Sequence, residues 1–320
     1  VLYNSFKFYT KYIKYKIVER NDIYMKKILF KGCGTAIVTP FNENGVNFDE
    51  FKKLIEFQIS EGVDALIVCG TTGESSTMTL EERKQTIEFA VKTANHRVPI
   101  IAGTGGNCTQ SVIDFTKWAE SAGVDGALIV TPYYNKTTQA GLIAHYSAIA
   151  SQTKLPIILY SVPSRTGVNI TPETCLELSK ISNIVAIKEA SGNLSQVAEI
   201  AALCKDTDFD IYSGNDDQIL PVLSLGGAGV ISVLANVIPK ETHDMCKLYF
   251  DGKTKESLDI QLKYLSLANS LFIETNPIPV KTAANLMGFK CGSLRLPLCD
   301  MEPSHLQVLK QELKNHNLIK

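Results

Sequence analysis

The feature that most constrains the fold of this chain is a short apolar run that recurs about every 30 residues. The eight runs cover residues 33–40, 65–70, 98–103, 126–132, 155–161, 184–190, 209–214 and 229–235. Runs that are apolar at nearly every position are typical of strands buried on both faces of a parallel sheet. The segments between them, such as residues 47–62 and 80–94, repeat apolar residues at intervals of three and four, which predicts helices.

Eight β-α units favour a closed (β/α)8 TIM barrel over a doubly wound sheet. The glycine-rich segment "GTGGN" (103–107) lacks the spacing of a dinucleotide fingerprint, and the chain carries no P-loop motif. Gly62 and Gly123 are expected to follow helix ends, just before the next strand. After the eighth run the pattern stays helical over residues 238–250, 253–272, 276–288 and 303–317. This predicts a barrel over residues 25–252 and a C-terminal helical subdomain over residues 253–320.

The first 24 residues differ in composition from the rest of the chain. They carry five Lys/Arg and two Asp/Glu, and Met25 comes directly after them. They lack the apolar core and the small-residue cleavage site of a signal peptide. We therefore expect residues 1–24 to be an extension outside the fold, with a basic amphipathic arm as the alternative.

Composition narrows the class of protein. The formal net charge of −1 argues against a nucleic-acid-binding surface. No run of about 18 apolar residues predicts a membrane span. The eight cysteines are scattered without a C-x-x-C pair, and the five histidines form no H-E-x-x-H motif. The sequence thus predicts a protein of the reducing cytoplasm, without a metal site or organic cofactor.

Functional side chains of a (β/α)8 barrel lie at the carboxyl ends of the strands and in the loops after them. In this chain those positions carry hydroxyls, glycines and charges. The motifs are "GTTGES" (70–75), "TPYYN" (131–135), "LYSVPSRTG" (159–167), "IVAIKEA" (184–190) and "SGND" (213–216). We expect them to converge on one rim of the barrel.

Lys188 ends the apolar run of residues 184–187. A lysine at a strand end commonly extends its ammonium group to water, and this is the structural alternative. Inside a partly apolar barrel mouth, loss of hydration instead favours the uncharged amine. Such an amine can attack a ketone and form a Schiff base, a reaction that needs no metal or organic cofactor. Lys188 is therefore the candidate nucleophile.

The other strand ends offer binding groups. The hydroxyls of Thr71 and Thr72, with the backbone N–H groups around them, can bind a carboxylate or phosphate, or can simply cap the next helix. The guanidinium of Arg165 can hold a carboxylate, or can form a surface salt bridge. Tyr160 is expected to point its hydroxyl at the barrel mouth, whereas a loop tyrosine such as Tyr134 more often serves packing.

Four motifs, "GTTGE", "TPYYNK", "LYSVPSRTG" and "IKEASGN", resemble in order and spacing those of the dihydrodipicolinate synthase and N-acetylneuraminate lyase family of class I aldolases. The resemblance covers about residues 30–318. It implies that Lys188 is the Schiff-base lysine and Tyr160 the proton-transferring tyrosine. It also implies that Thr72 links Tyr160 to Tyr134, which family members insert from a neighbouring subunit.

The resemblance also implies a set of substrate-binding residues and a reaction. Those residues are Thr71 and Thr72 for the carboxylate of pyruvate, Arg165 for the carboxylate of the aldehyde, and Gly214 and Ile231 for the lining of its pocket. The match is nearest to members that condense pyruvate with L-aspartate 4-semialdehyde to 4-hydroxy-tetrahydrodipicolinate, the first committed step of diaminopimelate and lysine biosynthesis. Alternatives are another pyruvate-dependent aldolase of the N-acetylneuraminate lyase or sugar-acid type, and a non-catalytic sensor on the same barrel. A shared Tyr134 requires at least a dimer, and we expect a homotetramer built as a dimer of dimers.

Two departures from the family pattern stand out. Ser161 replaces an asparagine of the family's "YNVP", and we expect little effect on the chemistry. Lysine-inhibited members use histidines and a glutamate at a subunit interface, and the matching positions here are Leu80, Arg83 and Ser111. The positions that remain compatible with lysine are Ser75, Asn107 and Tyr133. Without an acidic partner for the amine of lysine, we predict weak or absent feedback inhibition by lysine.

Overall fold

The computed structural model describes residues 28–320. The expectations for residues 1–24, and for the first residues of the barrel segment that we began at residue 25, lie outside this described range.

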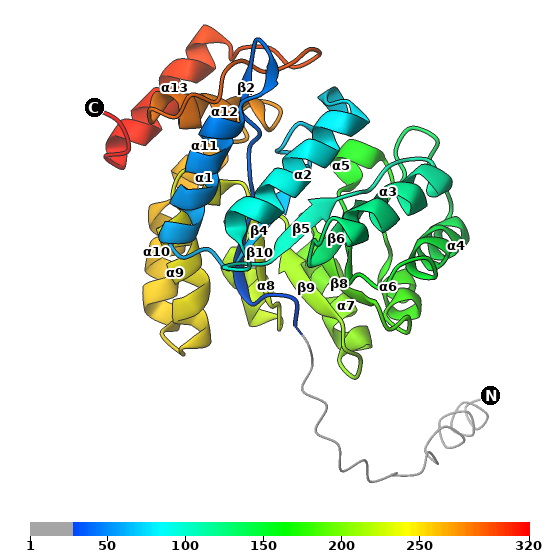
Figure 1. Ribbon diagram of the computed structural model, residues 1–320. Coiled ribbons are helices and arrows are strands. Elements are labelled where there is room, and N and C mark those ends of the chain that lie inside the picture. Colours follow the sequence, from blue (N-terminus) through cyan, green and yellow to red (C-terminus); the bar gives the residue numbers. More distant parts are fainter. Residues whose placement is uncertain (1–27) are drawn as a thin grey trace, which may run out of the picture.

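Eight parallel strands close into a barrel in the order β1-β10-β9-β8-β7-β6-β5-β4, which confirms the predicted TIM barrel (Figure 1). The strands are β1 (Gly32–Ala36), β4 (Ala65–Val68), β5 (Ile100–Gly103), β6 (Gly126–Val130), β7 (Ile157–Ser161), β8 (Ile184–Glu189), β9 (Asp210–Ser213) and β10 (Gly229–Ser232). Seven of the predicted apolar runs contain one whole strand, and the run of residues 33–40 contains β1 except for its first residue, Gly32. Every carboxyl end therefore opens on the same rim, where the motifs were expected to meet.

Helices connect successive strands and form the outer layer. They are α1 (Phe48–Ser60), α2 (Leu80–Ala94), α3 (Thr109–Ser121), α4 (Gln139–Ala150), α6 (Pro172–Leu178), α7 (Leu194–Cys204), α8 (Ile219–Ser224) and α9 (Pro239–Phe250). Local signals set their ends. Thr79 and Glu82 form a reciprocal capping box at the start of α2. Gly62 and Gly123 follow α1 and α3 with φ of +90° and +84°, a conformation that glycine adopts without strain.

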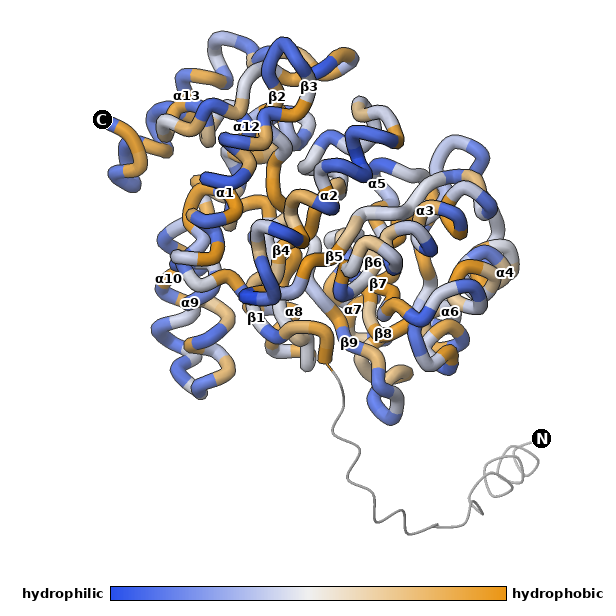
Figure 2. Tube along the Cα trace, viewed as in Figure 1, coloured by the Kyte–Doolittle hydropathy of each residue, from blue (hydrophilic) through white to orange (hydrophobic). Residues whose placement is uncertain are grey.

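Two apolar cores result from the alternation of side chains along the strands. One lies between the barrel and its helices, and a smaller one fills the barrel interior. Along β8, Ala186 belongs to the interior core, whereas Ile187 belongs to the outer one. Since successive side chains of a strand point to opposite faces, Lys188 points into the barrel. Figure 2 shows the hydrophobic residues concentrated along the central strands and hydrophilic residues on the outer helices.

The C-terminal helices are α10 (Thr254–Lys263), α11 (Leu265–Ser270), α12 (Ile278–Leu286) and α13 (Pro303–Asn315). The prediction of a single helix over residues 253–272 is wrong. The backbone leaves the helical conformation at Tyr264 (φ −102°, ψ 8°), and this break separates α10 from α11. Helix α12 begins at Ile278 rather than at residue 276, directly after Pro277. Helix α12 lies beside the hairpin of β2 (Phe41–Asn42) and β3 (Gly45–Val46), where the Lys281 amine is 4.1 Å from the centre of the Phe41 ring (Figure 1).

Short elements that the apolar pattern did not predict occupy the rim. They are the one-turn helix α5 (Pro163–Thr166) and the 3-10 turns η1 (Ser75–Thr77), η2 (Asp216–Gln218) and η3 (Leu234–Asn236). Within residues 28–320, no helix is long and apolar enough to cross a membrane.

Candidate active site

Lys188 and Tyr160 lie side by side at the carboxyl ends of β8 and β7, where they are register partners. The amine nitrogen of Lys188 is 4.5 Å from the centre of the Tyr160 ring. The two residues are only 5% and 7% exposed. The structure therefore brings the candidate nucleophile and the candidate proton-transfer group into contact, in an interior that is otherwise mainly apolar.

Gly214 follows β9 and packs against the lysine. A Cβ at this position would lie 2.6 Å from the Cβ of Ala190 and 3.1 Å from Cε of Lys188. The 2.6 Å approach is shorter than real Cβ contacts and the 3.1 Å approach is tighter than most of them, so a side chain at residue 214 would force Ala190 or the stem of Lys188 to shift. Ile231, on β10, is fully buried in the interior core.

Asp216 supplies a buried carboxylate near the lysine. It accepts hydrogen bonds from the Ser232 hydroxyl (2.5 Å) and from the backbone N–H groups of Val233 (3.0 Å) and Leu234 (2.9 Å). Burial raises the pKa of Asp216, while the hydrogen bond from Ser232, those from the backbone and the charge of Lys188 oppose that shift. Asp216 thus fixes the turn after β10 and contributes negative charge near Lys188.

Thr71 and Thr72 lie in the loop between β4 and η1. Thr72 is buried, and its hydroxyl oxygen accepts a hydrogen bond from the side-chain amide of Asn276 at 3.1 Å. Because its oxygen accepts from Asn276, the Thr72 hydroxyl keeps its own proton to donate elsewhere. Thr71 and Tyr160 both line a small cavity of about 50 Å³ in the barrel mouth.

Asn276 also holds Arg165, an exposed residue of α5. The Arg165 guanidinium donates to the backbone carbonyl of Asn276 at 2.9 Å. Asn276 therefore joins the threonine loop to the arginine, although these lie on different strand ends. The side-chain oxygen of Asn276 is buried and has no hydrogen-bond partner among the described residues.

Tyr134 stands apart from the buried groups. It is 93% exposed and has φ +69°, the left-handed conformation that a bulky residue rarely adopts. It lines a cavity of about 440 Å³ together with Thr71 and Arg165. Among residues 28–320, no hydrogen bond links Tyr134, Thr72 and Tyr160, so the predicted relay through these three hydroxyls stays a prediction.

The positions that we compared with lysine-inhibited relatives also gather at one place. Leu80, Arg83, Asn107, Ser111 and Tyr133 line a cavity of about 350 Å³ between α2 and α3. The Arg83 guanidinium lies 4.2 Å from the Phe115 ring and donates to the carbonyl of Gly103 at 3.0 Å. Burial lowers the pKa of Arg83. Ser75 lies nearby, in the lining of the larger cavity that contains Thr71.

Ser161 points away from the substrate side. Its hydroxyl donates to Asn169 at 3.3 Å and accepts from the backbone N–H of Ile170 at 3.3 Å. Its neighbour Tyr160 faces the barrel interior, so Ser161 faces the helices. The small effect of this serine on the chemistry stays a prediction.

Sequence reasoning missed Asn276 and the buried ion pair between Glu74 and Lys281, whose charged atoms lie 2.6 Å apart. These residues occur in the segments "GTTGES" and "TNPIPVK", more than 200 residues apart. A single sequence shows no sign of such a pairing. Within the described range, no group of three or more His, Cys, Asp or Glu side chains is placed to hold a metal ion.

A closed parallel barrel with polar groups of several strands gathered at the carboxyl ends defines the class of TIM-barrel enzymes. Comparison with known proteins gives the family. The chain belongs to the dihydrodipicolinate synthetase family, whose sequence profile matches residues 29–316.

Known proteins resemble the chain over nearly their whole length. The 4-hydroxy-tetrahydrodipicolinate synthase 1 of Clostridium acetobutylicum is 61% identical over 292 residues, which are 91% of this chain and 99% of that protein. The crystal structure of dihydrodipicolinate synthase from Thermotoga maritima superposes with a TM-score of 0.90 at 43% identity, covering 91% of this chain and 100% of that one. A monomeric dihydrodipicolinate synthase variant gives a TM-score of 0.89 at 43% identity, covering 91% and 98%.

Proposed function

We propose that this enzyme condenses pyruvate with L-aspartate 4-semialdehyde to give 4-hydroxy-tetrahydrodipicolinate. Family membership and the 61% identity to the clostridial synthase support this reaction. The single observation that carries the chemistry is Lys188, buried in the barrel mouth with its amine against the Tyr160 ring. No organic cofactor or metal is required by this reaction.

Lys188 acts as the nucleophile. Its free amine attacks the ketone carbon of pyruvate, and loss of water from the adduct leaves a protonated imine. The imine withdraws electrons, so the methyl group of pyruvate loses a proton and becomes an enamine carbon. This carbon attacks the aldehyde, whose oxygen takes up a proton. The amino group that the aldehyde substrate carries then attacks the imine carbon and closes the ring of the product. Lys188 leaves as the free amine, and the ring nitrogen gives up its extra proton. Tyr160 lies against the reacting nitrogen and is the group that moves these protons.

The rim groups bind the two carboxylates. Thr71 and Thr72 hold the carboxylate of pyruvate with their hydroxyl and backbone N–H groups. Arg165 pairs with the carboxylate of the aldehyde in the cavity of about 440 Å³. We assign Gly214 and Ile231 to the lining of the substrate pocket, because Gly214 leaves room for the lysine stem and Ile231 is buried in the barrel interior beside it.

Tyr134 serves the active site of a neighbouring subunit. Its 93% exposure and its left-handed backbone support this role, because a strained exposed tyrosine has no packing function within its own chain. Such a role requires a homo-oligomer, and we propose a tetramer built as a dimer of dimers. A monomeric variant exists among the related structures, so size-exclusion chromatography with light scattering is the direct test.

Three further assignments complete the proposal. The barrel ends near residue 252 and the helices from residue 253 form a subdomain, consistent with the break between α9 and α10 at residues 251–253. The enzyme acts in the cytoplasm, a proposal supported by eight cysteines that are all free.

Inhibition by lysine is weak or absent, because the cavity between α2 and α3 carries Arg83 and Ser111 where a lysine ligand would need an acidic partner. Submillimolar inhibition by lysine in a steady-state assay would contradict this last assignment.

The test of the function is pyruvate consumption by the purified enzyme with L-aspartate 4-semialdehyde, N-acetylmannosamine and glyceraldehyde in parallel. Consumption with aspartate semialdehyde alone is the expected result. Consumption with another aldehyde would keep Lys188 as nucleophile but move the enzyme to the lyase type. No consumption with any aldehyde, together with no borohydride-trapped pyruvate adduct, would favour a sensor.

A further inference from the structure

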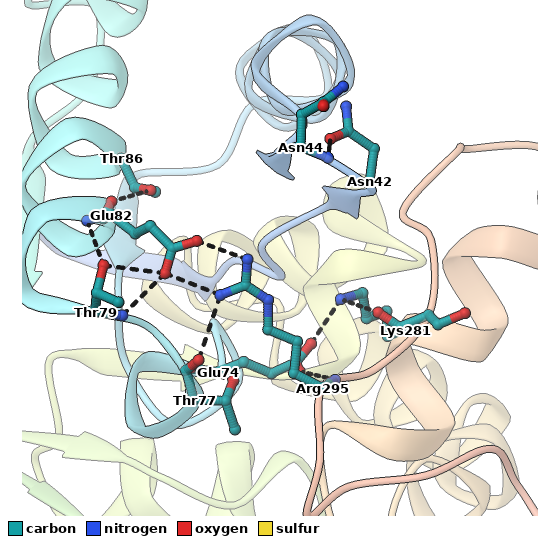
Figure 3. Close-up of polar contacts among 10 residues, drawn as sticks. Asn42, Asn44, Glu74, Thr77, Thr79, Glu82, Thr86, Lys281 and Arg295 are labelled. Carbon is teal, nitrogen blue, oxygen red and sulfur yellow. Dashed lines mark hydrogen bonds and ion pairs between the residues drawn. The ribbon is translucent and has the colours of Figure 1, made fainter.

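The loop that carries Thr71 and Thr72 is attached to the C-terminal helices through a buried carboxylate. Glu74 has φ +54°, and its side chain is fully buried. Oε1 accepts from the Lys281 amine at 2.6 Å, and Oε2 accepts from the backbone N–H of Arg295 at 3.1 Å. Figure 3 shows this carboxylate directed toward α12 and the segment after it.

Lys281 is held as firmly as its partner. It is 1% exposed, and its amine also donates to the carbonyl of Ser293 at 3.1 Å. The amine lies 4.1 Å from the centre of the Phe41 ring, which also contacts the Arg295 guanidinium. Burial lowers the pKa of Lys281, while the charge and hydrogen bond of Glu74 raise it. The ion pair therefore has one geometry, fixed from three sides.

The same C-terminal segment reaches the threonine loop at a second point. Asn276, which precedes α12, donates to the Thr72 hydroxyl at 3.1 Å. Lys281, on the first turns of α12, binds Glu74 two residues further along the loop. The backbone of the loop is joined on its other side by the Thr39 hydroxyl, which donates to the carbonyl of Gly73 at 2.8 Å. Residues 72–74 are thus bound on both sides.

We propose that the Glu74–Lys281 pair is a positioning device for pyruvate, which sets the hydroxyls of Thr71 and Thr72 without touching the substrate. This inference rests on the proposed function of the two threonines. A buried ion pair adds little net stability compared with an apolar pair of the same volume, because both charges lose their hydration. What the pair adds here is a directional contact. This contact holds the backbone of Glu74 in a left-handed conformation, which residues other than glycine keep only when the surrounding structure holds them there.

A second ion pair between the same regions provides the matched control. Glu82, in α2, binds the Arg295 guanidinium through both oxygens at 2.6 and 2.9 Å (Figure 3). This pair is about one quarter exposed and lies outside the threonine loop. Glu82→Gln removes the same charge as Glu74→Gln and keeps an oxygen for the capping box of α2.

The experiment compares three purified variants with the parent enzyme: Glu74→Gln, the double variant Glu74→Gln/Lys281→Met, and Glu82→Gln. The pyruvate concentration for half-maximal borohydride trapping on Lys188 is measured first, then KM for each substrate, kcat and the thermal midpoint. We expect Glu74→Gln and the double variant to need at least tenfold more pyruvate, while KM for aspartate semialdehyde changes less than threefold. Glu82→Gln should stay within twofold of the parent for both substrates.

The double variant keeps the test decisive if the single one fails to fold, since it leaves no unpaired buried charge. A folded double variant whose half-saturating pyruvate lies within twofold of the parent would overturn the inference, even if its thermal midpoint falls. Equal rises in both KM values would also overturn it, because that pattern indicates general loosening of the rim. Failure of the proposed function is seen separately, as absence of a trapped adduct in the parent enzyme itself.

Discussion

Lys188 and Lys281 are both buried in this enzyme, and their surroundings differ. Lys281 is 1% exposed and forms an ion pair with Glu74 at 2.6 Å. Lys188 is 5% exposed, faces the ring of Tyr160 at 4.5 Å, and forms no ion pair within residues 28–320. The negative charge that acts on it comes from Asp216, whose oxygens are engaged by Ser232, Val233 and Leu234.

The difference distinguishes a structural lysine, Lys281, from the lysine that we propose as the nucleophile, Lys188. A buried ammonium ion needs a counterion, and a carboxylate at hydrogen-bond distance holds its proton in place. An amine without such a partner can give up its proton and then attack a carbonyl carbon. Burial alone therefore does not distinguish the two lysines, and the nucleophilic role proposed for Lys188 agrees with its lack of a directly bound carboxylate.

The largest expected effect comes from removing the reactive lysine. Lys188→Ala should lower kcat/KM by a factor on the order of 10⁴ or more, as when the nucleophile of a covalent mechanism is deleted. Borohydride trapping with pyruvate, read by mass spectrometry of the intact chain, should give no adduct. The thermal midpoint should stay close to that of the parent, because no ion pair is broken. An adduct of undiminished yield on the variant would assign the nucleophile to another residue.

The structural lysine should give the opposite pattern. Lys281→Ala leaves the Glu74 carboxylate buried without its cation, a change that destabilises proteins by about 3–5 kcal/mol. Urea unfolding monitored by circular dichroism should show this loss, while Lys188→Ala under the same conditions should show little. If the two substitutions destabilise the fold equally, the distinction between the lysines does not hold.

The sequence predicted one lysine of this comparison and not the other. A functional role for Lys188 could be predicted from the sequence, because this lysine ends an apolar run and the carboxyl ends of barrel strands meet at one rim. Lys281 occurs in "PIPVKTAAN", which reads as an ordinary helix, and its partner Glu74 is 207 residues away. Tertiary pairing across such a separation leaves no local pattern, and the same holds for the hydrogen bond from Asn276 to Thr72.

The remaining differences between expectation and structure have local causes. The break at Tyr264 escaped prediction because apolar residues continue at helical intervals on both sides of it. The turns at the rim, such as α5 around Arg165, contain too few residues to show a period. The eight strands were predictable because both faces of the sheet are covered, so most strand residues are apolar, as in β4 and β5.

Tyr160→Phe tests the group that faces the reactive lysine. The phenylalanine keeps the ring beside the amine of Lys188 and removes only the hydroxyl. Proton transfer by a positioned side chain contributes about 10²–10⁴ in rate, so we expect kcat to fall by about 10²–10³. The pyruvate concentration for half-maximal trapping should change less than threefold. A variant with normal kcat would show that another group moves the protons.

The smallest expected effect tests the space around the reactive lysine. In Gly214→Ala, the new methyl group would lie 3.1 Å from Cε of Lys188 and 2.6 Å from the Cβ of Ala190. Overpacking of this kind destabilises the folded protein by about 1–3 kcal/mol. It should also push the amine of Lys188 away from the Tyr160 ring and lower kcat about tenfold.

Gly226→Ala is a useful comparison, since no atom lies within 4 Å of its Cβ position, although its φ of +91° also disfavours alanine. A stability loss shared by both variants, with kcat reduced only in Gly214→Ala, would show that the glycine at residue 214 serves the position of Lys188 rather than the fold. Equal kcat values in the two variants would remove that role from Gly214.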